Sequence, residues 1–409
     1  MRILFLSRWF PFPADNGSKL RVINLIKQLS ARHVVHLISF TSEPVDGKRW
    51  AALRGLCQQV DTVLYQPFQP LSWRALTGFF DARPRSVVDT FSPEMQALVR
   101  RAMRDYSFDM VIASQIDMAP YLREWPRRAR VLEELELTTI YEHYTQARGP
   151  WRRWRAGLTW WKLSNYVQRL LGDLDLCTVV SEAERENVRR IAPAARVEVV
   201  TNGVDVASYN GVFGVPQADT LIYSGALTYS ANYDAVEFFL REIYPRLLAA
   251  RPGLKFLITG RLDGVPVQRL PQLPGVTFTG YLDDIRPAIA ASWASVVPLR
   301  VGGGTRLKIL EALALGTPVV ATRKGAEGLE LVPGRDALIA DDPAEFAEAV
   351  LTLLADPDLR ARLSRHGRRL VEAQYDWAAI GRRFDGLLES VAGPARSSPV
   401  RAERGRLAL

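Results

Sequence analysis

Cysteine is scarce in this sequence, and its two cysteines lie far apart. Cys57 and Cys177 stand in apolar surroundings, without the short spacings of a metal site or of a disulfide framework. Isolated cysteines of this kind behave as small hydrophobic residues. We therefore expect both to be buried, free thiols in a protein of a reducing, cytoplasmic compartment, and we predict no metal site.

Long hydrophobic runs are also missing. The apolar start of MRILFLSRWF is interrupted at Arg8, too early for a secretory signal, and no cleavage site follows it. The longest uncharged apolar stretch, between Arg286 and Arg300, is shorter than the roughly 20 residues that cross a bilayer. We therefore expect no membrane-spanning segment, and the first residues are predicted to form a buried strand.

Size and charge narrow the class without identifying a ligand. The chain has 409 residues, of which 48% are hydrophobic and 24% charged, the balance of a folded protein with two domains of ordinary size. Its formal net charge of +9 favours acidic partners such as nucleotide phosphates, anionic lipid or nucleic acid. Charge alone does not choose among these three.

Short apolar, β-rich runs alternate with amphipathic helical stretches along nearly the whole chain. This alternation is typical of βαβ units around parallel sheets, with right-handed crossovers that place helices on both faces. The sequence therefore predicts an α/β protein with two doubly wound sheets. The strands that we expect are 2–6, 34–40, 62–65, 110–114, 130–134, 176–180 and 197–200 in the first half, and 220–225, 255–260, 276–280, 294–299 and 318–322 in the second.

The boundary between the two domains is expected at residues 201–216, where glycine, asparagine and proline interrupt the periodicity. Residues 1–200 then form an N-terminal domain, and residues 217–375 form a C-terminal domain. The last residues, 393–409, are small, basic and aperiodic, a composition that predicts a disordered basic tail.

The densest glycine cluster follows the predicted strand 294–299. In the segment VGGGTRLK (301–308), three glycines lead into a helix that we expect to begin near Thr305. Bare backbone there can approach a phosphate closely, and free N–H groups at a helix start attract anions. Arg306 and Lys308 add positive charge, and Glu311 places a carboxylate nearby. The cluster suits a polyanion that carries hydroxyl groups, and the alternative is a solvated turn.

From about residue 197 to 378 the sequence resembles the group 1 glycosyltransferases of family 4. The motifs VEVVTNGVDVASY, LIYSGALTYSANYDAVEFFL, KFLITGR and the glycine loop follow in that family's order, up to Tyr375-Asp376-Trp377. DNGSKLRVINLIKQLSARHVVHLISF is similar to the family's N-terminal glycine loop. The resemblance implies the GT-B architecture, in which two facing Rossmann-like domains enclose a cleft and the last helix, here 376–391, packs back on the N-terminal acceptor domain. It also implies retaining, metal-independent transfer from a nucleotide-diphosphate sugar, without a cofactor.

The resemblance assigns roles to single residues. Glu311 stands where the family has the glutamate that binds the ribose hydroxyls, and a carboxylate can accept both hydrogen bonds. Gly17 matches the glycine through which the first helix approaches the donor phosphate from the other domain, and its alternative role is an ordinary βα turn. The donor-binding residues that we predict are Gly17, Gly225, Arg261, Gly303, Gly304, Thr305, Arg306, Leu307, Lys308 and Glu311.

Two positions depart from the family pattern. The family has a further glutamate eight residues before Glu311, where this chain has Gly303, and the family's basic residues after the first donor-domain strand are missing from SGALTYSANYD (224–234). A retaining transferase without a metal must stabilise the departing diphosphate with cations and N–H groups. We assign this catalytic role to Lys308 first and to Arg306 second, with Arg261 as the remaining candidate.

The predicted acceptor side begins after the strand 130–134. Glu134 and Glu136 lie where relatives keep a His or Asp near the reacting sugar, and we assign them to acid–base catalysis. His143 falls inside the following helix and is expected to be a partly exposed helix residue.

An aromatic and basic segment comes next. Residues 143–172 contain no acidic residue, but they carry four of the ten tryptophans together with five arginines. Residues 151–171 fit an amphipathic helix that lies on anionic lipid, and the alternative is a surface helix whose tryptophans are buried against the N-terminal sheet. Both interpretations stay open. With the aromatic residues of 65–86, the segment suggests a glycan or a lipid-linked acceptor.

Taken together, these features predict a retaining hexosyltransferase of cell-envelope polysaccharide or glycolipid synthesis, cytoplasmic and peripheral to the membrane. A non-catalytic relative that binds nucleotide sugars is the alternative, because of Gly303 and the missing basic residues in 224–234. A dinucleotide oxidoreductase is disfavoured, because RILFLSRWFPFPADNGS lacks G-x-G-x-x-G. A nucleic-acid partner would rest on charge alone, and we predict none. The base, the sugar, the acceptor and the linkage are not predicted.

Overall fold

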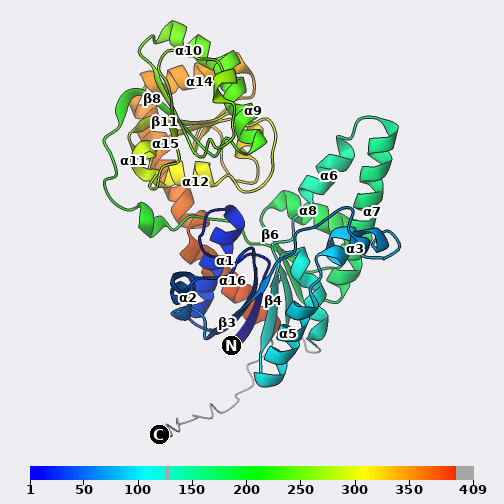
Figure 1. Cartoon of the computed structure of the whole chain (residues 1–409). Coiled ribbons are helices and arrows are strands. Elements are labelled where there is room, and N and C mark those ends of the chain that lie inside the picture. The colour runs from blue at the N-terminus through cyan, green and yellow to red at the C-terminus, as the bar shows by residue number, and fades with distance from the viewer. Residues whose placement is uncertain (126–128, 393–409) are drawn as a thin grey trace.

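The computed structural model describes residues 1–125 and 129–392. The chain folds into two lobes, which Figure 1 shows with the C-terminal lobe above the N-terminal one. The predicted tail, residues 393–409, lies outside the described residues.

The N-terminal lobe is built around a parallel sheet. Within the described residues this sheet has seven strands in the order β3-β2-β1-β4-β5-β6-β7. Its strands are β1 (Arg2–Ser7), β2 (Val34–Thr41), β3 (Gln59–Leu64), β4 (Met110–Ser114), β5 (Arg130–Glu133), β6 (Leu176–Val179) and β7 (Val197–Val199). Its helices are α1 (Gly17–Ser30), α2 (Gly47–Arg54), α3 (Trp73–Thr77), α4 (Arg85–Asp89), α5 (Pro93–Asp105), the 3-10 helix η1 (Ile116–Glu124), α6 (Thr138–Thr145), α7 (Pro150–Gly172) and α8 (Glu182–Ile191).

Both faces of this sheet are apolar and covered by helices. On β1, Ile3 and Phe5 pack with residues of α1, whereas Leu4 and Leu6 pack with residues of α5 and α7 on the other face. Alternate residues of a strand point to opposite faces, so a strand that is apolar at successive positions must be buried on both. Ligands therefore reach this domain at the ends of its strands.

The C-terminal lobe repeats this plan. In the part of the chain that the structure describes, its parallel sheet has six strands in the order β10-β9-β8-β11-β12-β13. Its strands are β8 (Gln217–Ser224), β9 (Lys255–Thr259), β10 (Val276–Gly280), β11 (Ser292–Val297), β12 (Val319–Ala321) and β13 (Leu338–Ile339). Its helices are α9 (Ser230–Phe238), the π-helical turn η3 (Phe239–Ile243), α10 (Tyr244–Ala250), the 3-10 turn η4 (Val267–Arg269), α11 (Arg286–Ala290), α12 (Leu307–Ala314), α13 (Arg323–Ala326), α14 (Pro343–Ala355), α15 (Pro357–Leu370) and the π-helical turn η5 (Val371–Tyr375).

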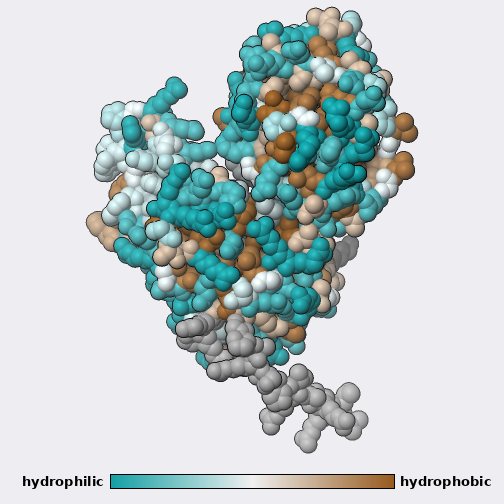
Figure 2. All heavy atoms as spheres, turned by 180° about the vertical axis from the view of Figure 1, so that it is seen from behind, coloured by the Kyte–Doolittle hydropathy of each residue, from teal (hydrophilic) through white to brown (hydrophobic). Residues whose placement is uncertain are grey.

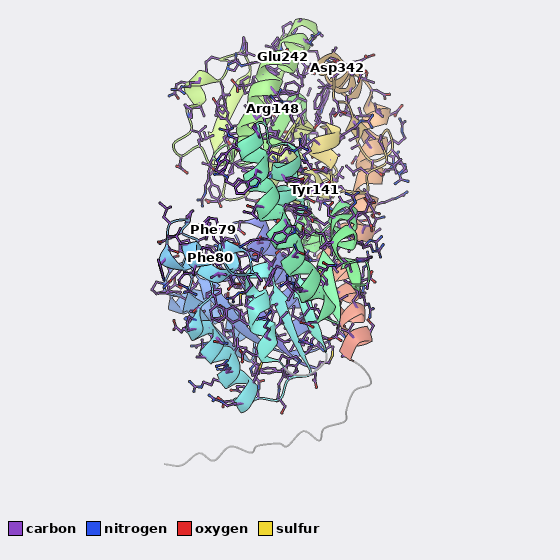
Figure 3. The ribbon with its side chains drawn as sticks, turned by 90° about the vertical axis from the view of Figure 1, so that its right-hand side faces the viewer. Phe79, Phe80, Tyr141, Arg148, Glu242 and Asp342 are labelled. Carbon is purple, nitrogen blue, oxygen red and sulfur yellow. The ribbon has the colours of Figure 1, made fainter. Side chains whose placement is uncertain are left out.

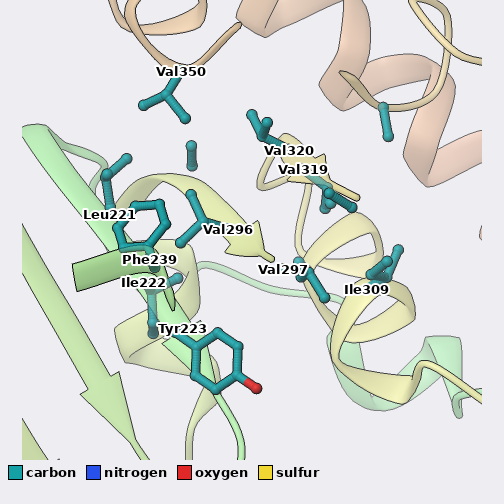
Figure 4. Packing of buried hydrophobic residues seen from close by; sticks show 14 of the residues in the cluster. Leu221, Ile222, Tyr223, Phe239, Val296, Val297, Ile309, Val319, Val320 and Val350 are labelled. Carbon is teal, nitrogen blue, oxygen red and sulfur yellow. The ribbon is translucent and has the colours of Figure 1, made fainter. Parts of the chain in front are cut away.

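The core of this lobe lies between the sheet and its helices. Figure 4 shows Leu221 and Val296 of the central strands close to Phe239 and Val350. Ile309 of α12 lies on the opposite side of Val296 from Leu221 in this view. These side chains are fully buried. The helix α12, which carries several predicted site residues, is thus fixed to the sheet through its apolar face.

Two segments cross between the lobes side by side. The loop after β7 leads to the 3-10 turn η2 (Val206–Tyr209), and the chain returns at the start of α16 (Trp377–Ala392). Val204 N donates to Tyr375 O at 2.8 Å, and Trp377 N donates back to Val204 O at 3.1 Å. A Cβ on Gly203 would lie 2.2 Å from Tyr375 O, so only glycine allows this approach. α16 then packs against α1 with Trp377, Ile380, Phe384 and Leu388.

The predicted fold class is confirmed, because both lobes are doubly wound parallel α/β sheets. All twelve predicted strands are present, and their starts differ from the expected ones by at most three residues. The prediction missed β13, a strand of two residues at the edge of its sheet. In the described residues, no helix combines the length and the apolar character that crossing a bilayer requires.

Candidate active site

Each sheet reverses its strand order at one point, between β1 and β4 in the N-terminal domain and between β8 and β11 in the C-terminal domain. Ligands of open parallel sheets bind at the carboxyl ends of the strands beside such a point. The loop after β1 leads to Gly17, the loop after β8 begins with Gly225, and the loop after β11 contains Gly303 and Gly304. The predicted glycines therefore stand where the topology favours ligand binding.

The glycine-rich loop lies between β11 and α12. Gly302 and Gly304 have φ angles of 99° and 80°, in the left-handed region that glycine adopts without strain. The helix begins at Leu307, two residues later than the expected Thr305, and no side chain caps its N-terminus. This end of α12 can therefore present N–H groups to an anion.

Arg306 is used inside the loop. Its guanidinium donates to the carbonyl oxygens of Gly303 at 2.7 Å, Gly302 at 2.8 Å and Lys324 at 3.0 Å, and the residue is only 5% exposed. Burial lowers the pKa of Arg306. The side chain that we ranked second for the leaving group is thus engaged in bracing the glycine loop.

Lys308 reaches from α12 to the end of β8. Its Nζ donates to the hydroxyl of Tyr223 and to Asn232 Oδ1, both at 2.9 Å. A Cβ added to Gly225 would come within 2.7 Å of this Nζ. Burial, assisted by the nearby charge of Arg306, lowers the pKa of Lys308 to about 7. The lysine therefore brings an amine to the loop 224–234, which has no basic residue of its own.

Glu311 lies one turn after Lys308 on α12. Its Oε1 accepts a hydrogen bond from the hydroxyl of Tyr209, a residue of η2 in the interdomain segment, at 3.3 Å. Burial raises the pKa of Glu311 to about 6. Since a carboxylate accepts several hydrogen bonds, the residue can bind hydroxyl groups beside Tyr209.

Gly17 begins α1 in the N-terminal domain. The preceding Asn16 caps this helix, with its side-chain oxygen accepting from Lys19 N at 3.0 Å. A Cβ added to Gly17 would meet no atom within 4 Å. The protein itself therefore leaves the space next to Gly17 open, so a requirement for glycine at this position would come from a ligand.

Glu134 lies in a buried polar cluster near the same end of the sheet. Gln115 connects the cluster, because its Nε2 donates to Glu134 Oε2 at 3.0 Å and to Ser18 Oγ at 3.2 Å, while its Oε1 accepts from Trp9 Nε1 at 2.9 Å. Burial, together with the adjacent Glu133, raises the pKa of Glu134 to about 7. A carboxyl group with such a pKa can act as acid or base near neutral pH.

A chain of side chains ties the two domains together beside these glycines. Arg21, which is wholly buried in α1, pairs with Glu133 at 2.5 Å and donates through Nη1 to Asn202 Oδ1 at 2.8 Å. Asn202 Nδ2 in turn donates to Thr305 Oγ1 at 2.9 Å. The start of α1 and the glycine loop are therefore held at the same interdomain junction.

A pocket of about 370 Å³ lies between the domains next to this junction. Figure 2 shows from behind the notch that separates the two lobes. The pocket is lined by Glu136, Thr139, Glu142, His143 and Gln146 from one domain and by Tyr229, Arg300, Val301, Gly302, Gly303, Gly304 and Lys324 from the other. Lys324 and Glu142 form a salt bridge of 3.0 Å from one domain to the other. The predicted residues Glu136, Gly303 and Gly304 meet in this pocket.

Other predicted residues lie outside the pocket lining. Gly225, Lys308 and Glu311 group together in the C-terminal domain, and Glu134 stays in its own buried cluster. Arg261 is exposed, with its guanidinium carbon 5.6 Å from the centre of the Tyr281 ring. In residues 1–125 and 129–392, no group of three or more His, Cys, Asp or Glu side chains is arranged to hold a metal ion.

Several residues at the site were not predicted. Tyr223 and Asn232 hold Lys308, Tyr209 holds Glu311, and Lys324 borders the pocket. Lys324 follows the strand β12, so the rule that ligands bind at carboxyl strand ends could have found it. The partners of Lys308 come from positions 85 and 76 residues away, and no local pattern connects them.

Comparison with protein families gives matches in both domains. The family described as Glycosyltransferase Family 4 matches residues 16–208, and the family described as Glycosyl transferases group 1 matches residues 218–356. Together these matches include the interdomain pocket residues, the glycine loop and α12.

Two curated relatives match part of the chain. A GDP-mannose-dependent monoacylated alpha-(1-6)-phosphatidylinositol monomannoside mannosyltransferase from Corynebacterium glutamicum is 31% identical over 164 residues, which are 37% of this chain and 43% of that protein. Glycogen synthase from Mycobacterium tuberculosis is 28% identical over 200 residues, 46% of each chain. The matched region thus spans less than half the length of these relatives.

The whole fold is found in solved structures. HepE from Anabaena, crystallised in complex with UDP, aligns over 96% of this chain and 100% of its own with a TM-score of 0.64 and 18% sequence identity. At this identity the similarity concerns the fold. The alignment extends across both domains.

Proposed function

This chain belongs to the group 1 glycosyltransferases of family 4, and we propose that it is a retaining glycosyltransferase that takes a sugar from a nucleotide-diphosphate donor. The donor is proposed to bind in the C-terminal domain, between the loop 224–234 and the glycine-rich loop. The proposal is supported by family membership, by the GT-B arrangement of two doubly wound domains, and by the known relatives' use of nucleotides: one is named for GDP-mannose, and HepE was crystallised with UDP.

The observation that carries the proposal is the position of Lys308. The loop after β8 lacks the basic residues that the family pattern places there, yet the Lys308 amine lies directly beside Gly225 of that loop. When the bond between the anomeric carbon and the diphosphate oxygen breaks, negative charge develops on that oxygen. A cation placed at this point stabilises the transition state. Lys308 therefore supplies from α12 the charge that the loop itself does not carry.

The remaining residues fit this arrangement. Gly302 and Gly304 let the backbone approach the diphosphate, Glu311 accepts the ribose hydroxyls, and Arg306 keeps the loop in shape. On the acceptor side, Glu136 lines the pocket opposite the glycines, so its carboxylate can take the proton of the acceptor hydroxyl as that oxygen bonds to the anomeric carbon. Glu134, buried behind Gln115, is assigned a supporting role in this proposal.

We also propose that the enzyme works at the cytoplasmic face of a membrane, on an acceptor of cell-envelope polysaccharide or glycolipid synthesis. Trp151, Trp154 and Trp161 on α7 are 59–72% exposed, and Phe80 beside α3 is 95% exposed. Lys162 holds the loop that bears Phe79 and Phe80 by donating to three of its carbonyl oxygens, at 2.7–3.0 Å. Figure 3 shows both phenylalanines beside α7. Exposed indoles next to arginines suit the headgroup region of an anionic bilayer.

A turnover assay tests the proposed activity. The purified protein is incubated with UDP- and GDP-sugars, and release of the nucleoside diphosphate is followed with and without lipid-linked and glycan acceptors. The proposal expects release that depends on the acceptor and a product that keeps the donor's anomeric configuration, measured by NMR coupling constants. Nucleotide binding without turnover of any donor would favour the non-catalytic relative, for which Gly303 in place of a glutamate is the motivating observation.

A further inference from the structure

A second cavity adjoins the interdomain pocket, between α6 and α7. It has a volume of about 670 Å³ and is lined on one side by His143 and Gln146, and on the other by Arg152, Arg155 and Thr159. The α7 residues are spaced by three and four positions, so they share one face of the helix. Arg148, in the turn between the two helices, closes the end of this groove, and Figure 3 shows it at the tip of the hairpin.

The groove borders the proposed active site along α6. His143 and Gln146 line both cavities, so α6 forms their common wall. On the far side of that wall lie Glu136 and the glycines 302–304. A molecule that is bound in the groove at one end and extends around α6 would therefore place its other end beside the glycine loop.

The charge of the groove is of one sign. Arg148, Arg152 and Arg155 line it, and none of the residues that line it is acidic. In the described part of the chain these three arginines have no salt bridge, and the nearest acidic residue of α6, Glu142, is paired with Lys324 at 3.0 Å. Three guanidinium groups that line one groove without a carboxylate among its lining residues offer planar N–H donors that suit the oxygens of a phosphate.

We propose that this groove binds a phosphate or diphosphate group of the acceptor, so that the acceptor is a phosphate-bearing glycan. The proposal rests on the proposed transferase function and specifies its acceptor. Arg148, Arg152 and Arg155 bind the phosphate oxygens, and the sugar attached to that phosphate extends past His143 and Gln146 to Glu136. The reacting hydroxyl then lies at the glycine loop, where the donor's anomeric carbon is presented.

The phosphate can belong to a lipid carrier or to a soluble sugar phosphate. Trp151 and Trp154 stack on each other at 5.2 Å, are exposed, and alternate with Arg152 and Arg155 in the same two turns of α7. An isoprenoid or acyl chain next to the phosphate would contact these indoles, whereas a soluble sugar phosphate would not. The two sources therefore differ in how much the chain adds to the affinity.

Binding measurements on the whole protein test the groove. Affinity is measured by calorimetry for farnesyl diphosphate and for inorganic pyrophosphate, in the presence of UDP and GDP at saturating concentration so that the donor site is filled whichever base it takes. Octyl glucoside serves as a neutral probe. The variant Arg152→Gln/Arg155→Gln is expected to bind both phosphate probes at least tenfold more weakly than the wild type, with the octyl glucoside result unchanged. Farnesyl diphosphate binding much more tightly than pyrophosphate indicates a lipid carrier, and equal affinities indicate a soluble sugar phosphate.

Arg153→Gln is the matched control. Arg153 is an exposed arginine of the same helix that does not line the groove, so its loss should leave the affinity for both phosphate probes unchanged. Equal affinities for the wild type and the double variant, or an equal loss in the control, would overturn the proposal. If the protein binds no nucleotide at all, the transferase function fails, while the difference between the double variant and its control still reports on the groove.

Discussion

The amine of Lys308 lies so close to Gly225 that a Cβ on the glycine would come within 2.7 Å of it. The two residues are far apart in the sequence and come from different elements, the loop after β8 and the helix α12. Tyr223 and Asn232 fix the amine in this place by accepting its hydrogen bonds at 2.9 Å. The glycine thus makes room for a cation at the carboxyl end of the central strand.

The first prediction separates Lys308 from Arg306. Lys308→Met should leave the fold intact and reduce kcat by roughly a hundredfold or more. The reason is that a cationic side chain that contacts the departing diphosphate stabilises the transition state. Arg306→Met should instead destabilise the protein by about 1–3 kcal/mol, since three partly buried carbonyl oxygens lose the hydrogen bonds that a buried arginine donates to them. Turnover assays and urea unfolding measure the two effects. An inactive but fully stable Arg306→Met protein, together with normal turnover in Lys308→Met, would reverse the assignment.

The second prediction concerns pH. Because the pKa of Lys308 is lowered to about 7, its amine is largely neutral in the free protein above that pH. A bound diphosphate favours the ammonium form, so binding takes up a proton between about pH 7 and 9 and the affinity falls as the pH rises. Calorimetry with a sugar nucleotide in buffers of different ionisation enthalpy measures this uptake. Lys308→Met should abolish it, and an unchanged uptake in that variant would mean that another group titrates.

The third prediction uses two glycines that both begin a helix and have open space at their Cβ position, Gly17 in α1 and Gly47 in α2. Gly17→Ala should fold normally but bind the donor more weakly, about tenfold, because the added methyl group would occupy the space assigned to the phosphate. Gly47→Ala is the control and should change neither stability nor donor affinity. Donor binding that is equal in both variants would mean that Gly17 forms only an ordinary βα turn.

The fourth prediction addresses the membrane. Trp154 and Trp161 are 59% and 62% exposed, so replacing both with Ala should not unfold the protein. It should reduce sedimentation with vesicles that contain anionic lipid, because each indole loses its place in the headgroup region. Tyr281→Ala, which removes a 63% exposed aromatic ring from the other domain, is the control. Vesicle binding that survives the double substitution, or is lost equally in Tyr281→Ala, would contradict the assignment of this surface.

Sequence patterns predicted the fold well because they are local. Apolar runs such as 2–6 and 110–114 are buried on both faces of a parallel sheet, and that requirement is visible in composition alone. The glycine-rich loop could also be predicted from the sequence, because a run of glycines marks a position where the backbone adopts unusual conformations. In the structure Gly302 and Gly304 have φ angles that favour glycine. The edge strand β13 was missed because two residues carry too little pattern to be recognised.

The roles of the cations could not be predicted in the same way. Arg306 and Lys308 are two positions apart, so the helix start places them on different sides, and only tertiary structure decides which of them meets carbonyl groups and which meets Tyr223 and Asn232. The buried pair of Arg21 and Glu133 was missed for a related reason, because its partners are 112 residues apart. The groove between α6 and α7 likewise exists only once the hairpin has folded.

The donor site itself is tested most directly by nucleotide affinity. Calorimetry with UDP and GDP is performed on the wild type, on Glu311→Ala, and on Tyr209→Phe, which removes only the hydroxyl that Glu311 accepts from. A ribose-binding carboxylate predicts that the wild type binds one of the two nucleotides and that Glu311→Ala loses roughly 1.5–3 kcal/mol of binding free energy, with a smaller change in Tyr209→Phe. A wild type that binds neither nucleotide, or a Glu311→Ala protein that binds as tightly as the wild type, would contradict the proposed donor site.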